Sequence, residues 1–406
     1  MSRPAIAAFV PTAPDWRLDW DGLRRAFGWV ERLHACPQDP RHHAEGDVGT
    51  HTRLVCEALL GLPAFRALPA AERRVAFAAA LLHDIAKPDV TVHQPDGRIT
   101  SHGHSRRGAV DARVLLWREG WSFAERETVA RLVAVHQYPF YAMERADPLA
   151  LVRKLSHEVR LDLLCLLAEA DARGRRTAAP KDGQKTLDNV EMVRLLAEED
   201  GCLDQPYPFA DDRTRFLYCR DVATDGVARR PAEFPTHGHL DTPGVYDVTV
   251  LCGLPGCGKD TWLARNRPGL PVVGFDSARV ALGVSHDDDQ GAVVQAVQEQ
   301  ARQLLNPKNR RRFVWNATNT NPQLREKCLG LLAAYDARVE IVYLETDEAE
   351  MRRRNRARPD RTRVPDEAID RMLLRWEPPL ATECHRIDYV IDGAPSVDPA
   401  QWRSAT

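Results

Sequence analysis

The segment GLPGCGKDT, from Gly253 to Thr261, constrains the fold of this chain more than any other segment. It follows the apolar run VYDVTVLC (245–252) and precedes DTWLARN (260–266), which has the pattern of a helix. A G-x-x-x-x-G-K pattern is typical of a loop whose backbone amides face the phosphates of a nucleoside triphosphate, with the lysine near the β/γ oxygens. Because that loop connects a strand to a helix, the segment predicts an α/β domain around Lys259.

The rest of the C-terminal region follows an α/β pattern. Helical segments such as DQGAVVQAVQEQARQLL (289–305) alternate with short apolar runs. These runs are VYDVTVLC (245–252), LPVVGF (270–275), RRFVWNA (311–317), RVEIVYLE (338–345) and IDYVID (387–392). Continuous apolar strands are typical of a parallel sheet covered on both faces. Ligands are then expected beyond the carboxyl ends of the strands.

The N-terminal region, from about residue 20 to 200, predicts an all-α domain. Apolar residues recur there at three- and four-residue spacing. The clearest examples are DGLRRAFGWVERLHA, AAERRVAFAAALLHDIA, AERETVARLVAVH and DLLCLLAEADARGR. APKDGQKT (179–186) is interpreted as a loop before one more helix. Residues 201–244 are interpreted as an irregular connector with a short strand around Arg215–Cys219. The predicted division is therefore a domain over 1–200, a connector over 201–244 and a domain over 245–406.

Composition limits the possible partners and the compartment. The 406 residues carry a formal net charge of -2, so no global positive field would attract long nucleic acid. An enzyme that binds a few terminal nucleotides remains compatible. Nine cysteines without a C-x-x-C pair predict buried free thiols rather than a structural zinc site. No apolar run reaches membrane-spanning length and no secretory signal is recognised, so we expect a cytoplasmic protein without a membrane partner.

Histidines gather in the N-terminal half, where ten of the 14 precede residue 160. Any single one, such as His34, His93 or His157, is expected to be a solvated or hydrogen-bonded surface residue, but several fall at expected helix ends together with aspartates. The candidates are His51, His83, Asp84, His104, His136 and Asp171. Adjacent helical residues point about 100° apart, so His83 can bind one metal ion while Asp84 bridges to a second. A mixed histidine and carboxylate set favours manganese, nickel, cobalt or iron, and two such ions would activate a shared water for attack on phosphorus.

The segments HHAEGDVGTHT, LLHDIAKP, GHSRRGA, VAVH and ADARGR resemble the HD phosphohydrolase superfamily, and most of all the HD domain appended to bacterial tRNA nucleotidyltransferases. The resemblance covers residues 30 to 180 and implies hydrolysis of 2′,3′-cyclic phosphates or of terminal 2′- or 3′-phosphates. The primary metal site that it implies consists of His51, His83, Asp84 and Asp171. A second site would be completed by His104 and His136, with His102 as an alternative to His104. Contacts to the scissile phosphate would come from His42, His43 and Lys87.

Polar residues follow the predicted strands of the C-terminal half. Asp276 and Arg279, one helical turn apart, follow the second strand. NATNTNP (316–322) follows the third, and the arginine-dense MRRRNRARPDRTRVP (351–365) is interpreted as a lid over a triphosphate. ATP would be bound by Gly253, Gly256, Cys257, Gly258, Lys259, Asp260 and Thr261. Asp260 stands where serine or threonine is usual, so either Asp260 or Thr261 would contact Mg²⁺.

These elements resemble the 5′-hydroxyl polynucleotide kinase of phage RNA repair and its bacterial relatives over residues 246 to 395. The resemblance implies that Lys259 neutralises the transferring phosphate and that Asp276 is the general base for the 5′-hydroxyl. Acceptor binding would fall to Arg279, Thr318 and Asn319, and the lid arginine would be Arg358 with Arg354 in support. The phage enzyme carries a D-x-D-x-T phosphatase motif, which does not follow here.

The two halves together predict a bifunctional enzyme that resembles bacterial HD–polynucleotide kinase fusions. It would use ATP, Mg²⁺ and one or two transition-metal ions to process the 2′,3′-cyclic or 3′-phosphate and the 5′-hydroxyl of broken RNA, with DNA left open. No nucleotidyl-lysine motif is evident, so a separate ligase would seal the ends; the oligomeric state is open. One alternative is a nucleoside or small-molecule kinase fused to an HD nucleotide phosphohydrolase. Such an acceptor lacks a neighbouring phosphate, so Arg279 would have no phosphate of the acceptor to bind. Another is a binding module without turnover, which the metal ligands and Lys259 argue against.

Overall fold

The chain folds into two compact units. The computed structural model describes residues 5–176, 180–223, 231, 233–238, 245–284, 291–359 and 362–404. The first unit comprises Met1–Tyr207 together with Pro399–Thr406, and the second comprises Pro208–Asp398. The chain therefore leaves the first unit once and returns to it near its end. The limits at residues 200 and 244 remain predictions.

The first unit is helical, as predicted, apart from one small hairpin of β1 (Val92–His93) and β2 (Ile99–Thr100). Its α-helices are α1 (Trp20–Ala26), α2 (Gly28–His34), α3 (Val48–Gly61), α4 (Pro63–Ala67), α5 (Ala70–Leu82), α6 (Lys87–Val90), α7 (His104–Arg118), α8 (Phe123–Val135), α9 (Tyr138–Tyr141), α10 (Pro148–Ser156), α11 (Leu161–Gly174) and α12 (Pro180–Glu199). Short 3₁₀ turns are η1 (Ile6–Phe9), η2 (Ala142–Glu144) and η5 (Pro399–Gln401).

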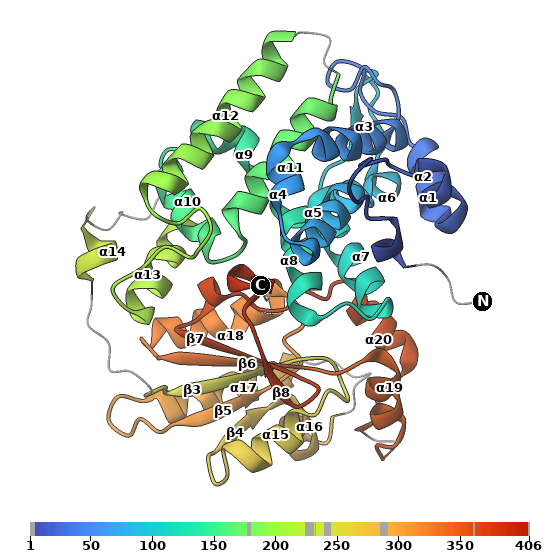
Figure 1. The fold of residues 1–406 in the computed structure, drawn as a ribbon. Helices are drawn as coiled ribbons and strands as arrows, with labels where there is room; N and C mark the ends of the chain where they lie inside the picture. Colours follow the sequence, from blue (N-terminus) through green and yellow to red (C-terminus); the bar gives the residue numbers. More distant parts are fainter. Residues whose placement is uncertain are drawn as a thin grey trace. The chain divides into compact units, whose positions relative to one another are not determined.

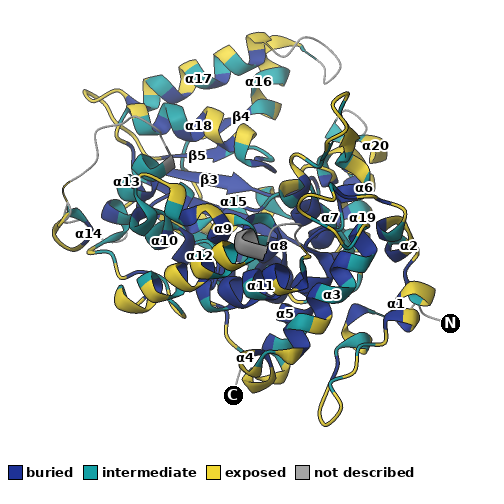
Figure 2. Ribbon diagram, turned by 90° about the horizontal axis from the view of Figure 1, so that it is seen from above, coloured by how far each residue is buried: buried dark blue, intermediate teal, exposed yellow. Residues whose placement is uncertain are grey.

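The core of the first unit lies around α5, α8 and α11, which are largely dark blue in Figure 2. α5 is rich in alanine and leucine, the residues with the highest helix propensity, and nearly all of its second half is buried. α8 begins at a cap in which the Ser122 side chain accepts a hydrogen bond from the Glu125 amide. These buried helices give a rigid frame for the side chains at their ends.

Residues 399–404 hold the opposite ends of the same three helices. Thr128 of α8 donates to the carbonyl of Pro399 over 3.2 Å, and the Ser404 hydroxyl donates to Glu72 of α5 over 3.2 Å. Arg160, which precedes α11, pairs with the Glu72 carboxylate at 2.7 Å. The end of the described chain is thus part of the helical unit.

The second unit is built around a six-stranded sheet (Figure 1). The order is β4-β5-β3-β6-β7-β8, parallel throughout except for the antiparallel pair β7–β8. The strands are β3 (Val248–Cys252), β4 (Val272–Gly274), β5 (Phe313–Asn316), β6 (Val339–Glu345), β7 (Arg386–Ile391) and β8 (Ala394–Ser396). The helices are α13 (Asp212–Ala223), α14 (Phe234–His237), α15 (Lys259–Asn266), α16 (Phe275–Leu282), α17 (Gly291–Leu305), α18 (Pro322–Ala334), α19 (Glu348–Arg356) and α20 (Asp366–Leu373), with a 3₁₀ turn η4 (Ala381–Glu383).

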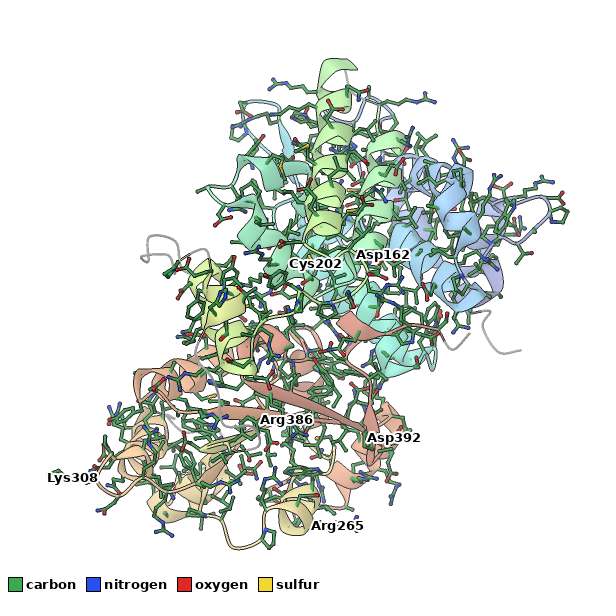
Figure 3. The ribbon with its side chains drawn as sticks, turned by 60° about the vertical axis from the view of Figure 1, so that its left-hand side comes forward. Asp162, Cys202, Arg265, Lys308, Arg386 and Asp392 are labelled. Carbon is green, nitrogen blue, oxygen red and sulfur yellow. The ribbon has the colours of Figure 1, made fainter. Side chains whose placement is uncertain are left out.

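The predicted α/β class with a mostly parallel sheet is confirmed. β3 and β6 are buried at every position, as expected for central strands covered on both faces, and their polar members Thr249, Glu340 and Glu345 are buried as well. Figure 3 marks the two ends of β7 by Arg386 at its start and Asp392 just beyond its end. The edge marked by Asp392 is the carboxyl edge of the parallel strands, where this class of sheet binds ligands.

Two local predictions were wrong. The strand expected around Arg215–Cys219 lies within helix α13, because Phe216 and Cys219 share one helical face and are both buried. The Asp211 carboxylate caps its first turn by accepting from the Thr214 amide over 2.7 Å. The loop expected over 179–186 is largely helix, because α12 begins at Pro180. Proline fits the first position of a helix, where the backbone N–H that it lacks would have no partner within the helix. Positions 224–230, 232 and 239–244 of the expected connector lie outside the described residues.

Candidate metal centre and phosphate loop

The predicted metal ligands of the first unit lie at or next to the ends of five helices, and their side chains meet at one place. His51 lies in the first turns of α3, whose cap is Asp47. His83 and Asp84 follow α5, His136 follows α8, His104 opens α7, and Asp171 lies in the last turn of α11. All six residues are buried. Helix ends leave room for side chains to converge without blocking one another.

The ligand atoms form two groups joined by one carboxylate. His51, His83 and Asp171 make one group, and Asp84, His104 and His136 make the other, each with ligand atoms within 4.8 Å of one another. Asp84 Oδ2 lies 3.2 Å from His83 Nε2, while Asp84 Oδ1 lies 3.5 Å from His104 Nε2. The two oxygens of Asp84 therefore face different groups, which is the arrangement needed to bridge two ions.

The tautomers of three histidines are set by the backbone. In His83, His104 and His136, Nδ1 lies 2.7–2.8 Å from the carbonyl oxygen of the residue three positions earlier. A carbonyl only accepts, so Nδ1 carries a proton and Nε2 is the ring nitrogen directed to the cluster. Nε2 of His136 is buried without a hydrogen-bond partner among the described residues. An orphaned nitrogen beside carboxylates fits divalent metal ligation.

A carboxylate that the sequence reasoning missed supports the fourth histidine. Glu45 Oε1 lies 2.8 Å from His51 Nδ1 and 2.9 Å from His43 Nδ1. His51 Nε2 is then directed to Asp171 Oδ1 at 3.1 Å. The signal was present in HHAEGD, where an acidic residue stands two positions from His43.

The charges around the cluster balance its carboxylates. Lys87 Nζ lies 2.8 Å from Asp84 Oδ2 and donates to Gln38, and Arg175 Nη2 lies 3.2 Å from Asp171 Oδ1. Burial opposes ionisation, yet His83 and Lys87 hold the pKa of Asp84 well below its usual value. Arg175 and His51 do the same for the pKa of Asp171.

Of the predicted phosphate contacts, two join the cluster and one does not. His43 reaches it through Glu45, with its ring centroid 4.8 Å from that of His51, and burial lowers the pKa of His43 to about 3. Lys87 reaches it through Asp84. His42 is exposed on the preceding turn. Arg175, which sequence reasoning did not select, lies in ADARGR, four residues after Asp171.

The phosphate loop of the second unit requires its glycines. Gly253, Gly256 and Gly258 have φ angles of 147°, 84° and 101°, which side chains rarely permit. A Cβ on Gly256 would lie 2.4 Å from the carbonyl oxygen of Met351 in α19. The loop therefore packs directly on the helix that begins the arginine-dense segment.

Both charged side chains of this loop, Lys259 and Asp260, have partners within the second unit. Lys259 Nζ donates to the carbonyls of Gly253 and Leu254 over 2.8 and 3.0 Å. Asp260 accepts from Asn316 Nδ2 at 2.9 Å and pairs with Arg358 Nη2 at 3.2 Å. The unusual Asp260 thus connects the loop, the end of β5 and the predicted lid arginine.

The predicted acceptor residues lie beyond the same strand ends. Asp276 in the first turn of α16 follows β4 and pairs with Arg279 at 2.6 Å, with 69% of the Asp276 side chain exposed. Thr318 accepts from the Gly253 amide through its carbonyl, and Asn319 donates to the Leu251 carbonyl over 3.1 Å. Strand pairing β4-β5-β3 brings these segments to one edge.

Two buried residues support that edge. Arg325 of α18, fully buried, donates to the Asn319 carbonyl and pairs with Glu383 at 2.6 Å. Sequence reasoning missed it, because an arginine within a helix gives no distinct signal. Trp376 is fully buried and donates to the Tyr343 hydroxyl over 3.0 Å.

The arginine-dense segment is also rich in ion pairs. Arg354 pairs with Glu350 at 2.6 Å, while its Nη1 would lie 3.6 Å from a Cβ placed on Gly258. Arg352 pairs with Glu348 at 2.8 Å and with Asp366 at 3.2 Å. Arg354 and Arg358 are thus the described arginines of this segment that lie against the loop.

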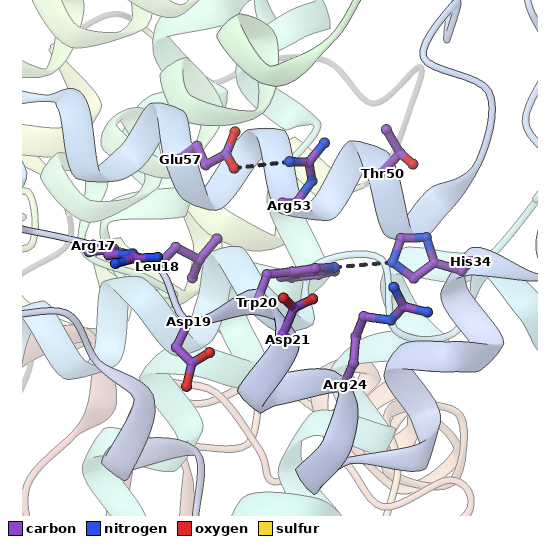
Figure 4. Close-up of a pocket in the computed structure, with 10 residues that line it drawn as sticks. All are labelled: Arg17, Leu18, Asp19, Trp20, Asp21, Arg24, His34, Thr50, Arg53 and Glu57. Carbon is purple, nitrogen blue, oxygen red and sulfur yellow. Dashed lines mark hydrogen bonds and ion pairs between the residues drawn. The ribbon is translucent and has the colours of Figure 1, made fainter.

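A separate hollow of about 690 Å³ lies on the outer side of α3 (Figure 4). Arg53 and Glu57 of α3 form one wall, and Trp20 donates to His34 Nε2 over 3.1 Å across it. None of the metal ligands lines this hollow. It is a mixed-charge surface depression rather than part of the metal centre.

Two family models match the chain. Residues 48–175 match the HD domain, and residues 248–379 match a family described as an AAA domain. The chain therefore combines a helical HD domain with a kinase-like P-loop domain, and the pair supports a hydrolase–kinase fusion. The metal-ligand pattern and the phosphate loop each fall within the matching range.

Curated relatives share part of the chain. A Multifunctional CCA protein of Methylococcus capsulatus is 33% identical over 181 residues, which are 43% of this chain and 39% of that protein. A Multifunctional CCA protein of Thioalkalivibrio sulfidiphilus is 29% identical over 220 residues, which are 52% of this chain and 45% of that protein. The chain thus spans less than half the length of these relatives.

Two predictions from composition can also be compared with the structure. All nine cysteines are free and buried, as expected for apolar thiols in the core. In the part of the chain that the structure describes, every helix is too short or too polar to cross a membrane.

Proposed function

We propose that the protein heals both ends of a broken RNA strand, with DNA as an open alternative. The HD unit would convert 2′,3′-cyclic or terminal 2′- or 3′-phosphates, and the P-loop unit would phosphorylate a 5′-hydroxyl with ATP. One observation carries the proposal: two phosphate-type sites occur in the same chain. In the first, the two oxygens of Asp84 face two histidine groups. The second combines a phosphate loop with the Asp276–Arg279 pair. A separate ligase would join the healed ends, in the cytoplasm.

In the HD unit, the residues fit two divalent ions. His51, His83 and Asp171 would hold one, His104 and His136 the other, and Asp84 would bridge them. Ions of this kind lower the pKa of a bound water and polarise phosphorus. The ammonium of Lys87 and the ring of His43 would bind the non-bridging phosphate oxygens, while the buried walls keep the six ligands in place.

In the P-loop unit, positioning and charge would do most of the catalytic work. Lys259 would exchange the carbonyls of Gly253 and Leu254 for phosphate oxygens, and Mg²⁺ would bind at Asp260 or Thr261. Asp276 would accept the proton of the 5′-hydroxyl, and Arg279 would bind the phosphate next to the acceptor nucleoside. Arg358, with Arg354, would neutralise charge on the ATP phosphates, while Thr318 and Asn319 would line the acceptor pocket.

A second candidate comes from the names of the relatives, which are Multifunctional CCA proteins. A CCA-type activity would place nucleotides, rather than a phosphoryl group, on a nucleic-acid end. The fate of the ATP label separates the two: γ-labelled ATP marks the 5′ end in a kinase reaction, whereas α-labelled ATP marks the 3′ end in nucleotide addition. We expect transfer only from the γ position.

The direct test uses one oligonucleotide with a 5′-hydroxyl and a 2′,3′-cyclic phosphate, incubated with ATP, Mg²⁺ and Mn²⁺, followed by analysis of both ends. Lys259→Ala and Asp276→Ala should abolish only 5′ labelling, and Asp84→Ala should abolish only 3′-end conversion. Each variant is the control for the other site. A wild-type protein that phosphorylates free nucleosides and changes neither oligonucleotide end would contradict the proposal.

A further inference from the structure

Two tyrosines on α9 are unusually exposed. Tyr138 and Tyr141 have 42% and 53% of their surface exposed. Among the residues that the structure describes, every other tyrosine, phenylalanine and tryptophan is buried or half-buried. Aromatic rings are normally used to fill cores and interfaces, so a pair left in solvent on one short helix calls for a ligand.

α9 is fixed to the metal centre from two sides. It begins two residues after the ligand His136, which closes α8. Between the two exposed tyrosines lies Phe140, which is buried and has the Arg175 guanidinium 5.1 Å from its ring centroid. Arg175 in turn contacts the ligand Asp171 at 3.2 Å. The chain of contacts from Asp171 through Arg175 to Phe140 anchors the helix beside the ligands.

The backbone of α9 is held as well. Asn189 of α12 donates to the Phe140 carbonyl over 2.6 Å, which occupies a carbonyl at the end of this single turn. Phe140 is packed inward, and the partly exposed ring of Tyr141 remains against it, with the two ring centroids 6.3 Å apart. The rings are therefore presented on a fixed support rather than on a free loop.

We propose that Tyr138 and Tyr141 form a stacking surface for the base of the terminal nucleotide whose phosphate occupies the metal centre. The inference rests on the proposed function of that centre and adds the substrate class: a phosphoester that carries a nucleobase on a single strand. Every base has a π face, so stacking selects a nucleic-acid end without selecting its sequence. Hydrogen bonds to a base edge are not required.

The test compares two substrates with the same reacting group. One is an oligonucleotide ending in a 2′,3′-cyclic phosphate, and the other is glycerol 1,2-cyclic phosphate, which has no base. Tyr141→Ala and Tyr138→Ala should each lower kcat/KM for the oligonucleotide about tenfold, the usual range for loss of one base–aromatic contact. Neither change should alter kcat/KM for glycerol 1,2-cyclic phosphate.

Conservative and matched variants keep the result interpretable. Tyr141→Phe and Tyr138→Phe retain the ring and should restore oligonucleotide turnover. Met192→Ala removes a side chain of similar exposure, 45%, from α12 of the same unit, and should leave both substrates unaffected. Thermal unfolding of each variant shows whether α9 still folds onto Phe140.

The outcomes separate the inference from the proposed function. If the wild-type protein opens neither cyclic phosphate, the proposed function fails and the inference fails with it. If the wild type opens both but the alanine variants lose activity equally on both, the tyrosines support the fold or a protein partner instead, and the stacking surface is rejected. A loss confined to the oligonucleotide supports it.

Discussion

The two units handle phosphate chemistry with opposite designs. In the HD unit, all six predicted ligands are buried and their ring tautomers are set by backbone carbonyls or by Glu45. In the P-loop unit, Asp276 is largely exposed, and the ammonium of Lys259 donates a hydrogen bond to the carbonyl of Gly253 in its own loop. The side chains of the first site are already oriented toward one another, whereas those of the second form pairs that a bound triphosphate would have to replace. Differences in response to substitution should follow from that contrast.

The largest expected effect concerns the support of His51. Glu45→Ala removes the acceptor that orients both His51 and His43, so the affinity for Mn²⁺ should fall about 10- to 100-fold. Glu45→Gln keeps an acceptor oxygen and should retain most of the wild-type affinity for Mn²⁺. Titration calorimetry with Mn²⁺ measures the loss, and ATP affinity serves as the control. Unchanged Mn²⁺ affinity in the alanine variant would show that the HD site is not preorganised through Glu45.

The next effect concerns the glycine loop. Gly256→Ala places a Cβ at φ 84° and 2.4 Å from the Met351 carbonyl, so the free energy of unfolding of the P-loop unit should fall by about 1–3 kcal/mol. Gly269→Ala, at φ 78° but with open space around the Cβ, is the matched control for backbone strain alone. Chemical denaturation compares them. Equal losses would mean that the packing of the loop on α19 contributes nothing.

A buried histidine gives the P-loop unit its own pH dependence. Burial, with Arg338, Arg213 and Arg215 nearby, lowers the pKa of His385 from 6.5 to about 4, and its Nδ1 accepts from the Val339 amide. The folded state thus favours neutral His385, whereas the unfolded chain protonates near 6.5. Stability is complete above pH 6.5 and decreases toward pH 4, by about 2 kcal/mol between pH 7 and 5.

His385→Asn retains an acceptor and does not titrate, so it serves as the matched variant for that pH profile. Denaturation between pH 5 and 7 should give a shallower slope in His385→Asn than in the wild type. The same slope in both proteins would place the acid sensitivity elsewhere.

The smallest effect concerns the unusual aspartate of the loop. Asp260→Ser removes the pair with Arg358 and restores the common residue type, so ATP affinity without Mg²⁺ should rise by less than about fivefold, because an exposed ion pair contributes little. Asp260→Asn keeps an acceptor for Asn316 and should behave similarly without Mg²⁺. A large fall in affinity would mean that Asp260 binds the nucleotide rather than opposing it.

The sequence predicted the fold class because both patterns are local. A strand, glycine loop and helix are contiguous around Lys259, and apolar residues at three- and four-residue spacing mark the helices of the first unit. The α13 error arose because FLYC (216–219) is a short continuous apolar run, and periodicity alone does not separate a strand from a buried helical turn in such a run.

The site could be predicted only in part, and for a similar reason. The predicted metal ligands stand in recognisable segments, and the structure brings their side chains together. Glu45 and Arg175 stand close in sequence to His43 and Asp171, but an acidic or basic residue beside a candidate ligand is too common to be selected by spacing alone. Arg325 pairs with Glu383, 58 residues further along the chain, and no spacing rule reveals that partner. The roles of the individual residues in catalysis remain predictions.

The most direct test of the central claim is the electron paramagnetic resonance of the full chain titrated with Mn²⁺. If Asp84 joins two ligand groups, the wild type should bind two Mn²⁺ per chain and give the spectrum of an exchange-coupled pair. Asp84→Ala should give at most an isolated six-line signal. A wild-type spectrum that shows only isolated Mn²⁺, at any loading, would contradict a bridged centre and the HD chemistry built on it.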